Sequence, residues 1–329
     1  MSNILHKELQ LPRMKDRNAS TNIEPSAGKT GFTLIELLVV LAVFGLLFVL
    51  LLLPTYADSR TKSRSLRCLD NMNRVITATM MYTHDNHDLF PPNPSDGSSS
   101  SLGYCWAVGN VAGGMPNQSP PAGSATFNSD MSSNSNAFLL LRYAGGDSTV
   151  FRCTADPRKG YYSGTDFNKF GTIVPAIRSI SMSVAVGTID QSALNGGPHS
   201  GIPNQPVGGD WLTGVYHANR HNNPWRTYGS LVDMNIPIPA NTCVMIEEDP
   251  YSINDGLFAF SAGMAKWIDF PSTRHNMACV ISFGDSHVEL HKWQNPAMRL
   301  TSGAGSIPPI TPNDPDWVWL QARTSVRAQ

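Results

Sequence analysis

Residues 28–41 read Gly28-Lys29-Thr30-Gly31-Phe32-Thr33-Leu34-Ile35-Glu36-Leu37-Leu38-Val39-Val40-Leu41, and this stretch decides the N-terminal part of the fold. It joins a basic, polar leader to an apolar segment that carries one carboxylate, Glu36, near its start. No charged residue occurs from Leu37 to Leu53, and 22 residues run from Phe32 to the residue before Pro54. At about 1.5 Å per residue, a helix of this length just crosses a hydrocarbon core of ~30 Å. Placing a carboxylate inside a membrane costs a few kcal/mol of free energy, so the presence of Glu36 in this segment indicates that its side chain has a functional role.

Three other interpretations of this segment stay open. A removable secretory signal has an apolar core of roughly 7–15 residues, which is shorter than this one. An ordinary single-span anchor explains the hydrophobicity, but it explains neither Glu36 nor the Gly31-Phe32 junction. A buried helix of a soluble protein needs apolar surroundings on every side, which the rest of the chain can hardly supply.

Composition predicts a globular, loop-rich chain. Of its 329 residues, 15% are charged and 41% hydrophobic, and it contains 27 Gly and 24 Pro. The net charge is −1, so there is no electrostatic case for a nucleic-acid partner. Its five cysteines form no CxxC pair of the kind that binds metals, and their odd number leaves at least one thiol without an intrachain disulfide partner.

A second amphipathic stretch follows the apolar segment. After Pro54 an apolar residue recurs every three to four positions, at Leu66, Leu69, Met72, Ile76 and Met80. This spacing predicts that the helix continues to about His84 with one side packed on a globular head. Because both flanks of Pro54 are strongly helical, we expect this proline to kink the helix rather than end it.

The rest of the chain predicts an α+β head in which this helix packs on an antiparallel β-sheet. A short helix is expected over residues 138–143. Short β-branched or aromatic runs predict strands, at Val150–Cys153, Ser179–Val186, Cys243–Glu247, Leu257–Phe260, Ala278–Phe283 and Val288–Trp293, the last two forming a hairpin. We therefore expect a leader (1–31), a transmembrane helix (32–53), its continuation (54–90), a head (91–300) with irregular insertions near 93–136 and 191–230, and a C-terminal tail (301–329).

The run from Gly31 to Glu36 resembles the cleavage and methylation segment of bacterial type IV prepilins and type II secretion pseudopilins. The resemblance implies that prepilin peptidase, a membrane enzyme, cuts after Gly31 and methylates the new N-terminal Phe32. It also implies that Glu36 meets the free amine of a neighbouring subunit during filament assembly. That pairing supplies the partner that a carboxylate in a membrane requires.

Stretches of the head are similar to large pseudopilin-like members of this family: residues 68–72, 82–86, 151–153 and 252–256, and His275 followed ten positions later by Asp285. The resemblance makes Cys68 and Cys153 a candidate disulfide that ties the helix to the first strand. The subfamily usually has Gly where this chain has Ser286, which favours a different turn in the hairpin.

The resemblance also implies a single-pass protein of the inner membrane with its head outside the cytoplasm. Basic residues of the leader favour a cytoplasmic N-terminus, but Arg60, Lys62, Arg64 and Arg67 follow the span closely, so the charge count is nearly balanced. The expected partners are therefore prepilin peptidase, other pilin-like subunits that bind through the N-terminal helix, and membrane lipid.

Two groups of side chains are candidates for a metal site. Glu247, Asp249, Asn254 and Asp255 offer the oxygen ligands that Ca²⁺ prefers, although their spacing is also that of an ordinary acidic turn. His275 and Asp285 are expected side by side across the sheet, either as a hydrogen-bonded structural pair or as metal ligands. We therefore expect no cofactor, with Ca²⁺ as the alternative.

The favoured function is a structural pseudopilin-like subunit of a type IV pilus or a type II secretion filament. The chain has neither a Gly-x-Ser-x-Gly nor a His-Glu-x-x-His motif, so we expect no enzymatic activity. The alternative is a membrane-anchored binding protein whose head captures a surface ligand such as a glycan. Four tryptophans are available for stacking on such a ligand, although burial in the core explains them as readily: Trp106, Trp211, Trp225 and Trp293.

Overall fold

The computed structural model describes residues 31–93, 102–189, 205–302 and 310–329, apart from the side chains of residues 50–61. It divides the chain into two compact units, Met1–Pro54 and Thr55–Gln329, which we treat separately. The predicted leader, except for Gly31, lies outside the described residues.

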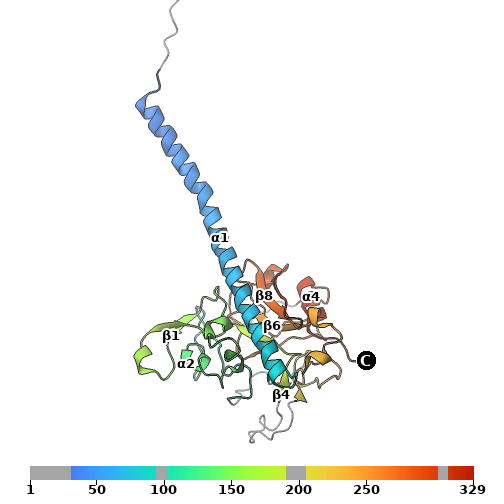
Figure 1. The fold of residues 1–329 in the computed structure, drawn as a ribbon. Helices are drawn as coiled ribbons and strands as arrows, with labels where there is room; N and C mark the ends of the chain where they lie inside the picture. Colours follow the sequence, from blue (N-terminus) through green and yellow to red (C-terminus); the bar gives the residue numbers. More distant parts are fainter. Residues whose placement is uncertain (1–30, 94–101, 190–204, 303–309) are drawn as a thin grey trace, which may run out of the picture. The chain divides into compact units, whose positions relative to one another are not determined.

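Helix α1 spans Leu34–Asp85, so its predicted end near His84 is confirmed (Figure 1). The helix continues through Pro54, as expected, and the kink there stays a prediction. In the first unit, every residue from 31 to 49 is exposed. Within the described part of the chain, no helix is identified as both long enough and apolar enough to cross a membrane.

In the second unit, α1 buries one stripe of side chains against the head. Cys68, Met72, Val75 and Ile76 on this stripe are at most 1% exposed. The predicted stripe is therefore correct at Met72 and Ile76, but it is wrong at Leu66, which is exposed. The 3–4 residue spacing fixes the period of the buried face, whereas the tertiary contacts decide its centre.

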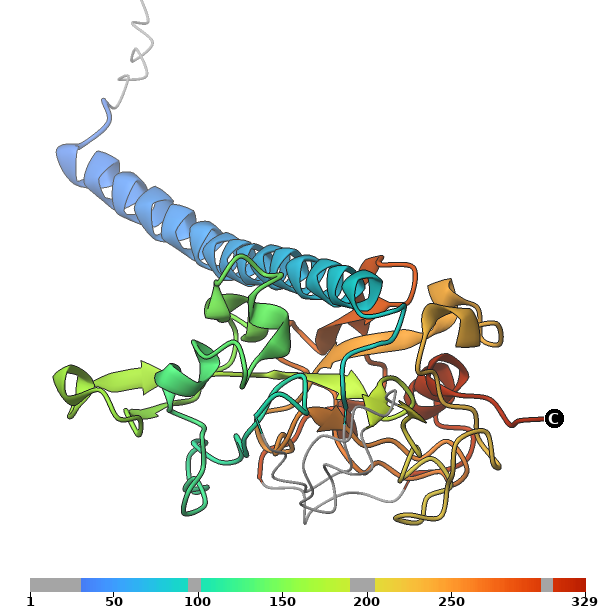
Figure 2. The same ribbon diagram turned by 60° about the horizontal axis from the view of Figure 1, so that its bottom comes forward.

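A five-stranded sheet forms the core of the head, in the order β7-β3-β6-β8-β9. The strands are β3 (Ile180–Ser183), β6 (Cys243–Glu247), β7 (Leu257–Phe258), β8 (Ala278–Phe283) and β9 (Val288–Lys292). All neighbours pair antiparallel except β3 and β7, which are parallel, so the sheet is mixed rather than antiparallel as expected. The part of α1 that belongs to the second unit lies over this sheet (Figure 2).

The remaining elements are short. Two small hairpins pair β1 (Lys159–Tyr161) with β2 (Ile173–Pro175) and β4 (Thr188–Ile189) with β5 (Gln205–Pro206). Helix α2 spans Ser129–Ser132 and helix α4 spans Pro315–Thr324. Single 3₁₀ turns occur at η1 (Leu139–Leu141), η2 (Ser148–Phe151), η3 (Phe167–Lys169), η4 (Leu231–Asp233), η5 (Pro239–Asn241) and η6 (Pro296–Met298).

One predicted strand is wrong. Residues 150–153 do not form a strand, because Asp147 accepts hydrogen bonds from the backbone N–H and the hydroxyl of Thr149 and so begins the 3₁₀ turn η2. The short helix expected over residues 138–143 is present as η1, and the hairpin of β8 and β9 is confirmed.

Two further details differ from the sequence analysis. The expected C-terminal tail contains α4. The residue before this helix, Asp314, caps it by accepting hydrogen bonds from the backbone N–H groups of Asp316 and Trp317. Leu320 of α4 is buried in the core. In the β8–β9 turn, Ser286 adopts φ +74°, so the turn keeps a left-handed residue although the glycine is absent.

Candidate functional site

Helix α1 begins with a reciprocal cap between Thr33 and Glu36. Glu36 Oε2 accepts hydrogen bonds from the Thr33 backbone N–H at 2.9 Å and from its hydroxyl at 2.8 Å, and the Glu36 N–H donates to Thr33 Oγ1 at 3.3 Å. This arrangement is a capping box, in which N-cap and N3 side chains satisfy backbone groups that the first helical turn leaves free. Glu36 is therefore not isolated within its own chain. The Thr-x-x-Glu spacing before an apolar run is the signal that the sequence analysis missed.

The residues that flank the expected cleavage site are accessible. Phe32 is 76% exposed, and a Cβ atom added at Gly31 would meet no atom within 4 Å. The hydrophobic side chains that follow are exposed all around the helix: Leu34, Ile35, Leu37, Leu38, Val39, Val40, Leu41, Val43, Phe44, Leu46, Leu47, Phe48 and Val49. Such a large apolar surface requires cover by lipid or by other protein chains.

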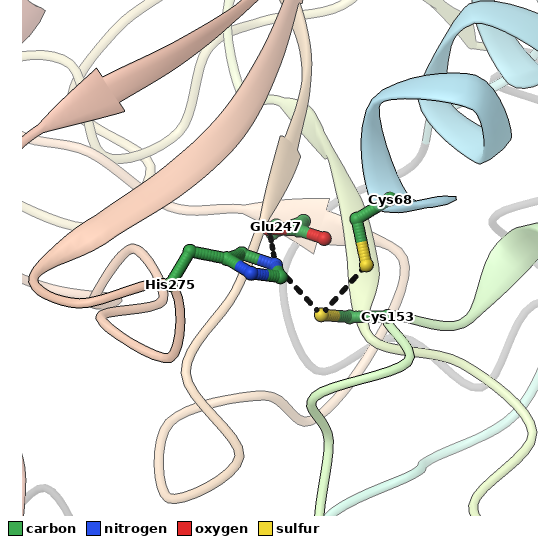
Figure 3. Close-up of side chains that lie close together, drawn as sticks. All are labelled: Cys68, Cys153, Glu247 and His275. Carbon is green, nitrogen blue, oxygen red and sulfur yellow. Dashed lines mark hydrogen bonds and ion pairs between the residues drawn. The ribbon is translucent and has the colours of Figure 1, made fainter. Parts of the chain in front are cut away.

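A second group of side chains lies inside the head, where four distant segments meet (Figure 3). Cys68 comes from α1, Cys153 follows η2, Glu247 ends β6 and His275 precedes β8. Each is at most 3% exposed, and one ligand atom from each lies within 4.8 Å of all the others. We call these four residues the Cys-Glu-His cluster.

The contacts in this cluster form a chain. The Cys68 and Cys153 sulfurs are 3.2 Å apart, Cys153 Sγ is 3.1 Å from His275 Nε2, and the same nitrogen is 3.3 Å from Glu247 Oε2. The other ring nitrogen of His275, Nδ1, lies 3.1 Å from the hydroxyl of Ser65. Ser65 and Cys68 are three residues apart, so they share the buried face of α1.

Backbone N–H groups also point at the cluster. Thr154 N–H donates to Cys68 Sγ at 3.2 Å, and Ala155 N–H donates to Cys153 Sγ at 3.3 Å. Val280 N–H, on β8, donates to Glu247 Oε2 at 2.9 Å. Three of the four side chains thus receive a donor that favours their negatively charged form.

The pKa values reflect this crowding. The hydrogen bond with Cys153 lowers the pKa of the Cys68 thiol to about 4, whereas the same contact raises the pKa of Cys153. Burial raises the pKa of Glu247. Burial alone would lower the pKa of His275, but hydrogen bonds and the charges of Cys68 and Glu247 raise it to about 10. Interactions within the cluster thus favour the charged forms of Cys68 and His275, whereas they disfavour the charged form of Cys153.

The prediction of a disulfide between Cys68 and Cys153 is only partly correct. The structure brings Cys68 and Cys153 together, as the family resemblance implied, but both are free cysteines. Their sulfurs are 3.2 Å apart, well beyond the bond length of about 2.05 Å.

The proposed calcium ligands do not gather into one cage. Glu247 is the last residue of β6 and belongs to the Cys-Glu-His cluster, whereas its neighbour Glu248 accepts hydrogen bonds from the hydroxyls of Ser181 and Ser252. Asp249 accepts from the Tyr251 N–H, while Asn254 and Asp255 accept from backbone N–H groups of their own turn. Of the four candidates, only Glu247 joins a group of ligand atoms within the described residues.

The expected His275–Asp285 pair is wrong. The two residues lie beyond opposite ends of the six-residue strand β8, which is about 20 Å long. His275 belongs to the Cys-Glu-His cluster, whereas Asp285 bonds to His287 in the β8–β9 turn. The ten-residue separation of His275 and Asp285 in the sequence therefore does not bring their side chains together.

The tryptophans offered for ligand stacking are mostly buried. Trp106, Trp225 and Trp293 are at most 6% exposed, and Trp106 and Trp293 each donate their indole N–H to a backbone carbonyl. Only Trp211 is partly exposed. Three of the four rings therefore belong to the core and cannot stack on a surface glycan.

One of the three comparisons with known proteins gives a match, and this match lies in the N-terminal segment. The comparison with curated proteins and the comparison with solved structures each return no match. Residues 27–52, however, match the family described as "Prokaryotic N-terminal methylation motif". This chain therefore carries a prokaryotic N-terminal methylation motif, as a type IV prepilin- or pseudopilin-like protein does.

Proposed function

We propose that this chain is a structural pseudopilin-like subunit. In this proposal, prepilin peptidase removes the leader after Gly31 and methylates Phe32. The mature chain then assembles through its N-terminal helix into a type IV pilus or a type II secretion-associated filament. The match of residues 27–52 to the methylation motif is the observation that carries the proposal.

The exposure of the N-terminal helix supports the assembly step. Hydrophobic side chains from Phe32 to Val49 are exposed on every side of the helix. A single partner surface would require only one apolar stripe, whereas insertion in lipid followed by packing among several identical helices uses the whole circumference. We accordingly place this segment across the inner membrane before assembly, with the head outside the cytoplasm.

The roles proposed for the head are structural. It offers subunit surfaces to the filament, and we assign it no catalytic activity. The capping box adds a detail to the role of Glu36: both bonds to Thr33 use Oε2, so the cap leaves Oε1 to accept from the N-terminal amine of a neighbouring subunit.

Processing can be tested by determining the N-terminus of the protein extracted from native membranes. The proposal requires a chain that begins at Phe32 and carries one added methyl group. A chain that never begins at Phe32 would refute the processing step.

A pair of glycine variants sharpens this test. Gly31→Leu should accumulate as uncut precursor, because a bulky residue would precede the scissile bond. Gly45→Leu is the matched control, because a Cβ atom at either glycine meets no atom within 4 Å and Gly45 lies 14 residues beyond the expected cleavage site. If Gly31→Leu still yields a chain that begins at Phe32, the assigned cleavage site is wrong.

A further inference from the structure

We propose that Cys68, Cys153, Glu247 and His275 bind one zinc ion, which fixes α1 to the sheet of the head. The chemistry of the four ligands selects the metal. Thiolate and imidazole ligands favour zinc, whereas Ca²⁺ and Mg²⁺ prefer sites built from oxygen atoms alone. The site is distinct from the N-terminal motif and does not depend on its processing.

The distances in the cluster are close to those of a tetrahedral zinc site. Zinc binds sulfur at about 2.3 Å and nitrogen or oxygen at about 2.0–2.2 Å, so the edges of a tetrahedron are about 3.8 Å for S–S, about 3.6 Å for S–N and about 3.4 Å for N–O. The corresponding contacts are 3.2 Å between the sulfurs, 3.1 Å from Cys153 Sγ to His275 Nε2, and 3.3 Å from that nitrogen to Glu247 Oε2. The sulfur–sulfur and sulfur–nitrogen contacts are about 0.6 and 0.5 Å shorter than these edges, and the remaining pairs of ligand atoms lie within 4.8 Å of one another.

The surroundings of the cluster are those of a metal site. Ser65 faces His275 Nδ1 at 3.1 Å, and when it accepts the proton of that nitrogen it leaves the Nε2 lone pair directed at the cluster. Two thiolates, one carboxylate and a neutral imidazole give the zinc complex a net charge of −1. The N–H groups of Thr154, Ala155 and Val280 point at the three anionic ligands and stabilise that charge.

Zinc accounts for all four residues, whereas a disulfide accounts for only two. A bond between Cys68 and Cys153 would leave the buried Glu247 carboxylate and the His275 ring facing an apolar disulfide. Burying such a charged pair is costly unless its remaining hydrogen-bonding groups are also satisfied. With zinc, each of the four side chains has a ligand role.

The role of the ion is structural. Four protein ligands complete a tetrahedral zinc shell and leave no position open for a substrate. The ion would join α1 to the segment after η2, to β6 and to the turn before β8. It would thus fix the helix to the sheet of the head.

Metal analysis of the full chain tests this inference. The protein, without a polyhistidine tag, is purified in detergent under reducing conditions from cells grown with zinc, and its metals are measured by mass spectrometry. We expect about one zinc per chain, and a small fraction of that in Cys68→Ser and in His275→Ala. Cys243→Ser is the matched control, because Cys243 is equally buried but lies outside the cluster, and it should keep its zinc.

A second measurement uses the unmodified chain, so it does not depend on whether a variant folds. Zinc is removed with a chelator and Co²⁺ is added. Binding should produce a sulfur-to-cobalt charge-transfer band and the strong visible bands of a tetrahedral site. Ser65→Ala should weaken zinc affinity by about 10- to 100-fold, as expected when the partner of a ligating histidine is lost.

Three results would overturn the proposal. The first is reduced wild-type protein that contains no zinc and gives no charge-transfer band with Co²⁺. The second is stoichiometric iron or copper in place of zinc. The third is a Cys68–Cys153 disulfide in protein extracted from native membranes with its free thiols blocked at lysis.

Discussion

The substitution Glu36→Gln separates the two roles that the structure and the family resemblance give to this residue. As a cap, Glu36 needs only a side-chain oxygen that accepts from Thr33, at the 2.9 and 2.8 Å contacts. Glutamine supplies such an oxygen and is itself a normal capping-box residue. As an assembly group, Glu36 needs its charge, which glutamine removes.

The two roles predict effects of very different size. A complete N-terminal cap contributes about 1 kcal/mol, so replacing one acceptor by another changes helix stability by a few tenths. The loss of one member of a desolvated, hydrogen-bonded charge pair costs about 2–5 kcal/mol. At 1.4 kcal/mol for each factor of ten, we expect Glu36→Gln to weaken association between neighbouring subunits by roughly 30- to 4,000-fold.

Crosslinking through an introduced cysteine measures this association. All five native cysteines are buried, whereas Val43 is 51% exposed on the N-terminal helix, so Val43→Cys places one reactive thiol on the proposed assembly surface. Because each chain carries one reactive thiol, membranes that contain this variant should yield a crosslinked dimer, and adding Glu36→Gln should reduce the product to monomer.

Thr33→Val is the matched control. It removes the hydroxyl that bonds to Glu36 but keeps the charge, so it should lose at most about 1 kcal/mol of helix stability and retain the crosslinked dimer. The assembly role of the charge is refuted if Glu36→Gln retains as much crosslinked dimer as Thr33→Val. In that case Glu36 serves the start of its own helix and nothing more.

Three further predictions concern the head. Asp156→Ala leaves the guanidinium of Arg158 buried without the carboxylate that it now contacts at 2.8 Å, so it should cost about 3–5 kcal/mol and lower the melting temperature by roughly 10 °C, while the double variant with Arg158→Met should recover part of that loss. Burial, and to a smaller extent Arg323, lowers the pKa of His291 to about 4, so the unfolded chain binds more protons than the folded one between pH ~6.5 and ~4. The free energy of unfolding should therefore fall by at most about 3 kcal/mol as the pH drops through this range, and His291→Phe, which keeps the ring, should remove that part of the pH dependence; equal slopes for both proteins would contradict the assigned shift. Ser286→Gly should raise stability by about 0.5 kcal/mol because Ser286 adopts φ +74°, and a denaturant midpoint that does not rise would show that the left-handed serine carries no strain.

The parts of the fold that could be predicted are those set by neighbouring residues. The end of α1 and both bounds of β8 follow the sequence pattern closely, because apolar periodicity acts over one or two turns of a helix or a few residues of a strand. The strand predicted at Val150–Cys153 failed for an equally local reason, since the Asp147 cap outweighs a short β-branched run. The parallel pairing of β3 with β7 was missed because it joins segments separated by a long connection.

The candidate sites divide in the same way. The sequence alone determined the N-terminal motif, because Gly31, Phe32 and Glu36 lie within six consecutive positions and the match over residues 27–52 requires no tertiary contact. Only the tertiary structure decided the partners of the buried titratable groups: Cys68 and Cys153 are 85 positions apart, Cys153 and His275 are 122 apart, and no spacing rule connects them. The packing of α1 on the sheet brings these side chains together and excludes water from them. Because a buried polar group without a partner is costly, these side chains interact with one another.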